Sequence, residues 1–176
     1  MMSKFPNSEV FGTNSSMEMK INDVFKSALK YHISGDINKA ENFYKLLINQ
    51  GFRHPAVFSN YGVICASFGR IKEAKELYKQ SINIFPSSPE AYSNYASLLI
   101  SEGNYQKSES LLRTAIKLKP VLIDAFLNLG TVVYKQNRSE ESIVIARRTL
   151  KLAPDNPNSY INLLFFLKSV DNAQES

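Results

Sequence analysis

The chain has 176 residues, of which 44% are hydrophobic and 21% are charged, and its formal net charge at pH 7 is +5. This composition is typical of a globular protein, and a mild, dispersed positive charge argues against a nucleic-acid partner. One cysteine, Cys65, excludes an internal disulfide framework, and no apolar run reaches the roughly 18 residues of a membrane span. The first residues contain no apolar segment typical of a signal peptide, so we expect a cytoplasmic protein without a membrane partner.

The two ends of the chain differ in composition from its middle. Residues 1–14 are rich in Ser, Asn and Met and contain Pro6 and Gly12, so we predict a flexible N-terminal tail. Ser15 and Glu18 have the spacing of a capping box, which predicts that the first helix begins at Ser15. The structured part is then expected to span 15–170, followed by a C-terminal tail over 171–176.

After the tail, the sequence repeats with a period of 34 residues. Segments 55–88, 89–122 and 123–156 follow the pattern closely, 21–54 follows it more loosely, and 157–170 repeats only its first half. A fixed period in this range is typical of a solenoid whose units bury their apolar faces against one another. The number of units exceeds the roughly three that such an array needs for stability.

Small residues, turn residues and prolines recur at fixed positions, counted from the first residue of each unit. Position 8 holds Ala28, Gly62, Ala96 and Gly130, and position 20 holds Ala40, Ala74, Ser108 and Ser142. Position 15 holds Gly35, Gly69, Gly103 and Asn137, which are residue types that end a helix in the left-handed conformation. Position 32 holds Pro86, Pro120 and Pro154, which cannot continue a second helix. Each unit is therefore predicted to be a pair of closely packed antiparallel helices.

This combined spacing resembles the tetratricopeptide repeat over about residues 21–170. The resemblance also includes an aromatic residue at position 4 of units two to four: Phe58, Tyr92 and Phe126. It implies an all-α fold, a right-handed α-solenoid of antiparallel helix pairs. The first unit departs from the family pattern, because Phe52 stands where proline is expected.

Positions 3, 7 and 10 should face the preceding unit. In the first unit they are Asp23, Ser27 and Lys30, a polar face suited to a capping repeat, so we expect the array to start there with no repeat lost upstream. The last helix instead carries apolar residues over most of its surface. We expect an interface there, with a second copy of the chain or a separate protein, formed by Tyr160, Ile161, Leu164, Phe165 and Leu167. The alternative is an exposed end that is simply tolerated.

No motif in the sequence indicates catalysis or metal binding. The two histidines, His32 and His54, have no Cys, Asp or Glu partner that helix geometry would bring close, and Cys65 occupies a core position. We therefore predict no enzyme activity, no cofactor and no metal.

Position 6 of the first helices holds Asn60, Asn94, Asn128 and Asn162, with Lys26 in the first unit. The array resembles the asparagine ladder of O-linked N-acetylglucosamine transferases, which implies clamping of a peptide backbone. An amide offers a donor and an acceptor, so such a ladder suits an extended peptide, although the same side chains also bond within such scaffolds. Neighbouring groove positions add four further candidates: Ser59, Ser93, Ser97 and Tyr134. Chaperone-binding members of the resembled family grip a C-terminal carboxylate with Lys, Arg and Asn side chains in the groove. Such a clamp is not expected here, because Glu90 stands where the resemblance would call for a lysine.

We therefore expect a non-catalytic protein-protein interaction module that binds an extended peptide segment in its concave groove. The alternatives are a substrate-recruiting module acting beside a glycosyltransferase- or sulfotransferase-type enzyme, and a scaffold that oligomerises through 157–170.

Overall fold

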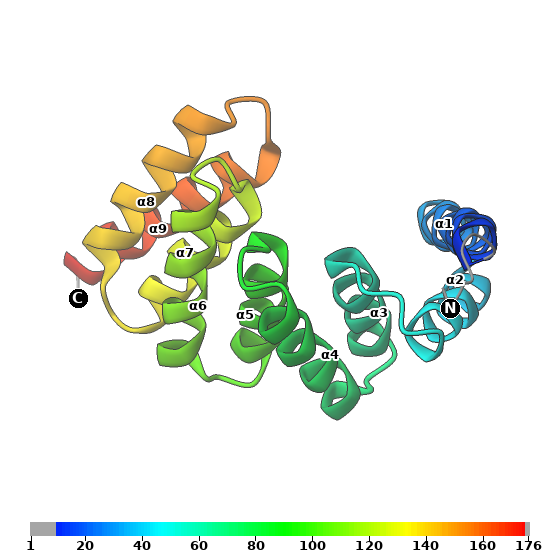
Figure 1. The fold of residues 1–176 in the computed structure, drawn as a ribbon. Helices are drawn as coiled ribbons and strands as arrows, with labels where there is room; N and C mark the ends of the chain where they lie inside the picture. The colour runs from blue at the N-terminus through cyan, green and yellow to red at the C-terminus, as the bar shows by residue number, and fades with distance from the viewer. Residues whose placement is uncertain (1–9, 175–176) are drawn as a thin grey trace, which may run out of the picture.

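The computed structural model describes residues 10–174, with side chains over 20–170, and this part of the chain consists of nine α-helices and no strand (Figure 1). The helices are α1 (Val10–Ile33), α2 (Ile37–Asn49), α3 (Pro55–Ser67), α4 (Ile71–Ile84), α5 (Pro89–Ser101), α6 (Tyr105–Leu118), α7 (Ile123–Lys135), α8 (Ser139–Leu152) and α9 (Pro157–Gln174). None of them is long and apolar enough to cross a membrane.

Successive helices pair along a curved array, as Figure 1 shows from α1 and α2 at one end to α8 and α9 at the other. The first helices also contact one another, α3 with α5, α5 with α7 and α7 with α9, while α9 packs on α8 as well. The predicted all-α solenoid of antiparallel helix pairs is confirmed.

The turns within the units adopt the left-handed conformation at the predicted residues. The φ angles are 80° at Gly35, 73° at Gly69, 75° at Gly103 and 61° at Asn137. The following amide then bonds back to the end of the first helix, as Arg70 N does to Cys65 O at 2.8 Å. The first unit uses a second such turn at its exit: Gly51 has φ 73° and Phe52 N bonds to Leu47 O at 2.9 Å. This turn ends α2 where the other units have proline.

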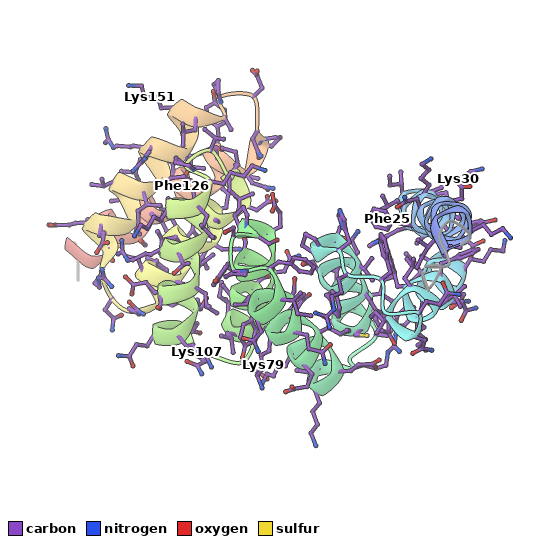
Figure 2. The ribbon with its side chains drawn as sticks, viewed as in Figure 1. Phe25, Lys30, Lys79, Lys107, Phe126 and Lys151 are labelled. Carbon is purple, nitrogen blue, oxygen red and sulfur yellow. The ribbon has the colours of Figure 1, made fainter. Side chains whose placement is uncertain are left out.

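Part of the core lies where the first helices meet the preceding unit. Positions 3, 7 and 10 are buried in units two to four: Val57, Tyr61, Ile64, Ala91, Tyr95, Leu98, Ala125, Leu129 and Val132. In α9 the same face buries Ser159 and Phe166, whereas Asp23 and Lys30 of the first unit are exposed. Exposed lysines such as Lys79, Lys107 and Lys151 lie on the second helices (Figure 2). Much of the positive charge therefore lies away from the face of the first helices.

Two helix boundaries differ from those predicted. Helix α1 begins at Val10 and not at Ser15, so residues 10–14 are helical; a capping-box pair is also tolerated inside a helix, and no proline follows Val10 before Ile33. Helix α9 continues to Gln174 and not 170, because no glycine or proline ends it. The rest of the predicted N-terminal tail, residues 1–9, lies outside the described residues.

Candidate functional site

The exposed face of α3, α5, α7 and α9, which we call the groove face, carries two adjoining depressions. The central depression has a volume of about 420 Å³ and is lined by Ser93, Asn94, Ser97, Asp124, Leu127, Asn128, Thr131, Asn158 and Asn162. The neighbouring depression, of about 410 Å³, is lined by Val63, Ala66, Ile71, Tyr78, Asn94, Ser97, Leu98 and Ser101. The first is mainly polar and the second mainly apolar, and Asn94 and Ser97 belong to both.

The four asparagines at position 6 fall into two groups. Asn60 donates from Nδ2 to Tyr44 Oη at 3.1 Å, and Asn162 donates from Nδ2 to Leu127 O at 3.3 Å. Asn94 and Asn128 line the central depression, and neither side chain has a hydrogen-bond partner among the described residues. The outer asparagines therefore bond within the scaffold, whereas the inner two keep their amides available.

The three candidate serines are also in different environments. Ser59 is 3% exposed and its hydroxyl lies 3.3 Å from that of Ser81, so it lies in the contact between α3 and α4 and lines neither depression. Ser93 occupies the same position one unit later and is 4% exposed, but Ala115 stands where Ser81 would be. Its hydroxyl lines the central depression without a partner in the described part of the chain. Ser97 is exposed where the two depressions meet.

The remaining two candidates lie elsewhere. Tyr134 is half-buried, and its ring centroid lies 5.2 Å from those of both Phe165 and Phe166 of α9. Lys26 is exposed and forms an ion pair with Asp23 at 3.4 Å. Neither residue lines the central depression.

The predicted apolar face of α9 is largely exposed. The exposed fractions are 48% for Tyr160, 59% for Ile161, 66% for Leu164 and 55% for Phe165, and Leu167 is half-buried. Four residues of the central depression, Asp124, Leu127, Thr131 and Asn158, are not among the predicted site residues. Asp124 and Asn158 stand at position 2 of successive units, in register with Glu90, and this register was the signal that would have found them.

His32 and His54 each have a hydrogen-bond partner within the protein, and Cys65 is part of the core. His32 Nδ1 lies 3.1 Å from Tyr44 Oη, and burial lowers the pKa of His32. Cys65 is fully buried, and burial, with a smaller contribution from Glu73, raises the pKa of its thiol to about 11. Within the described residues no group of three or more His, Cys, Asp or Glu side chains is arranged to hold a metal ion.

His54 caps α3: its Nδ1 accepts a hydrogen bond from Ala56 N at 3.2 Å, so the ring is neutral with its proton on Nε2. Burial lowers the pKa of His54 from its ordinary value of 6.5. As the pH falls through 6.5 the unfolded chain takes up protons that the folded state resists, so the free energy of unfolding should fall. We expect urea unfolding to show this loss between about pH 7.5 and about pH 5.5. His54→Asn, which keeps a capping acceptor that does not titrate, should make the loss smaller; an unchanged pH dependence would exclude His54 as its source.

The comparisons with known proteins agree with this geometry. Residues 21–49 and 66–122 match models of the tetratricopeptide repeat. The crystal structure of the MamA protein aligns with a TM-score of 0.71 and 21% identity, covering 88% of this chain and 85% of MamA. No curated protein sequence matches the chain.

Two other solved structures with this fold are described with a peptide-binding site or a bound peptide. YrrB, described as a tetratricopeptide protein with an unusual peptide-binding site, aligns with a TM-score of 0.66 and 16% identity, covering 80% of this chain and 72% of its own. The first repeat domain of Spaghetti (RPAP3), bound to an HSP90 peptide, aligns with a TM-score of 0.63 and 21% identity, covering 66% of this chain and 93% of its own. The chain thus carries tetratricopeptide repeats at the two matched segments and has the solenoid fold of such proteins.

Proposed function

We propose that the chain is a non-catalytic protein-interaction module that holds an extended segment of a partner protein on the groove face. The observation that carries this proposal is the pair Asn94 and Asn128, two amides in the same register of successive units with no partner in the described part of the chain. An amide donates and accepts hydrogen bonds, so such a pair suits the repeating N–H and C=O groups of a peptide backbone. The peptide-binding site described for YrrB and the HSP90 peptide bound to Spaghetti support peptide binding by a chain of this fold.

Of the four asparagines in register, only the inner two take part in binding in this proposal. Asn94 and Asn128 contact the peptide, Ser93 and Ser97 lie beside them, and the resemblance to the transferase ladder applies to these inner positions. Asn60 and Asn162 stabilise the scaffold through their bonds to Tyr44 and Leu127.

The charges of the groove face do not suit the free C-terminal carboxylate of a ligand. Lys26 is paired with Asp23, and Glu90 is paired with Lys119 Nζ at 2.8 Å. Asp124 is the only charged residue that lines the central depression, and its carboxylate would repel another. An internal, extended segment of the partner therefore fits better than a chain terminus.

Selection from a random peptide display library, followed by fluorescence anisotropy with the selected peptides, tests this proposal. The double variant Asn94→Ala/Asn128→Ala should bind at least about tenfold more weakly, since each lost hydrogen bond contributes about 1 kcal/mol. The matched control is Asn42→Ala/Asn83→Ala, which removes two exposed amides from the second helices α2 and α4. Equal losses in both double variants, or no loss in either, would contradict binding through the inner asparagines.

A second candidate function is supported by the exposed apolar face of α9. Four large side chains that are roughly half or more exposed on one helix favour an interface with a second copy, as in an oligomerising scaffold, or with a separate protein such as a transferase-type enzyme. Light scattering at high micromolar concentration separates the two, since a monomer contradicts self-association. A partner that the asparagine double variant retains and Leu164→Glu loses would locate binding on α9.

A further inference from the structure

We infer that the central depression is a specificity pocket for one basic side chain, arginine or lysine, of the bound peptide. The inference rests on the proposed function, because it requires a peptide lying on the groove face. It adds a preference for sequence to a backbone contact that is itself independent of sequence.

The first argument is the charge in the depression. Asp124 lies in the first turn of α7, is exposed, and is the only formally charged residue among those that line the depression. It forms no ion pair with any described residue, in contrast to Glu90, the acid at the same position of the preceding unit, whose carboxylate is 2.8 Å from Lys119 Nζ. Asp124 is thus the carboxylate that remains open to a ligand.

The second and independent argument is the hydroxyl of Ser93. The side chain is buried, with 4% of the residue exposed, yet it lines the depression and bonds to no described residue. Its counterpart Ser59 has the hydroxyl of Ser81 at 3.3 Å, whereas Ser93 faces Ala115 in that register. A ligand that donates a hydrogen bond to Ser93 Oγ would supply the partner that Ser59 finds in Ser81.

The third argument is the kind of group that the acceptors of the lining can hold. Acceptor oxygens surround the depression: the carboxylate of Asp124, the hydroxyl of Ser93 and the amide oxygens of Asn94, Asn128 and Asn158. Lysine and arginine side chains are donors only, with three and five N–H groups, so they can serve several acceptors at once. The volume of about 420 Å³ lies in the range of ligand pockets, roughly 300–1,000 Å³, and accommodates a long side chain.

The test is a positional-scanning library of N-acetylated, C-amidated peptides in which one position is varied in a background of Gly, Ser and Ala. We expect the wild-type protein to enrich Arg or Lys at one position, and the enriched peptide to weaken roughly tenfold when citrulline, a neutral isostere, replaces Arg. Asp124→Asn should abolish the difference between the Arg and citrulline peptides.

The control is Asp155→Asn, the same change at an exposed residue that does not line the depression, and it should retain the preference. Matching unfolding curves for both variants show that any change is local. Enrichment without a basic residue, or a basic preference that survives Asp124→Asn, would overturn the inference and leave the proposed function intact. Failure of every peptide to bind would overturn both.

Discussion

Phe166→Ala is expected to lower the free energy of unfolding by about 3–5 kcal/mol and to loosen α9 from the array. Phe166 is 2% exposed, and its ring lies 5.2 Å from that of Tyr134 on α7 in a stacked arrangement. It also fills the space above Gly130, where an added Cβ would lie 3.2 Å from Phe166 Cε2. No further helix covers α9 in the described chain, so this side chain carries much of its attachment. Chemical denaturation measures the loss, and hydrogen exchange of α9 amides shows whether it is local.

Two other residues of α9 supply control substitutions, one expected to lower the free energy of unfolding slightly and the other to raise it. Phe165 is 55% exposed, so Phe165→Ala should cost less than about 1 kcal/mol. Ser159 is fully buried and its hydroxyl has no partner among the described residues, so Ser159→Ala should raise the free energy of unfolding by about 1 kcal/mol. Equal costs for Phe165→Ala and Phe166→Ala would contradict the assigned orientation of α9.

The period, the helix pairs and the turns were predictable because each depends on a local residue type. Glycine or asparagine at position 15 permits a left-handed turn after the first helix, and Gly35 and Asn137 adopt it. The start of α1 was not predictable from Ser15, because a capping-box pair shows where a helix can begin without preventing an earlier start.

The partners of the asparagines depend on packing between units, which the period does not specify. Asn60 bonds to Tyr44, a tyrosine at position 24 of the preceding unit. Asn94 has Tyr78 at the same register, yet the two form no hydrogen bond. The same pair of residue types therefore bonds in one unit and not in the next, because a hydrogen bond requires the donor and acceptor atoms to lie within about 3 Å of each other. The free hydroxyl of Ser93, by contrast, could have been found by noting Ala115 in place of Ser81.

The close contact between Gly62 and the Tyr78 ring predicts that Gly62→Ala lowers the free energy of unfolding by about 1–3 kcal/mol. Helix propensity alone predicts the opposite, since alanine is better than glycine inside a helix by about 1 kcal/mol. A Cβ at Gly62 would lie 2.6 Å from Tyr78 Cε1 and 2.9 Å from Cδ1, well inside van der Waals contact. Tyr78 is 2% exposed and its ring centroid lies 6.2 Å from that of Tyr95, so the ring cannot move without displacing other core residues.

Two further variants separate steric overlap from a general effect of the substitution, each measured by urea unfolding. Gly130→Ala occupies the same register, but its Cβ would meet Phe166 at 3.2 Å, so it should cost less than Gly62→Ala. Tyr78→Leu removes Cε1 and Cζ, two of the three ring atoms that a Cβ at Gly62 would meet, so in a double-mutant cycle the two changes should cost less together than the sum of their separate costs. Additive costs would mean that the Tyr78 ring does not limit the size of residue 62, and that position 8 is small for another reason. A coupled result would show that the contact between Gly62 and Tyr78 sets how closely α3 and α4 pack.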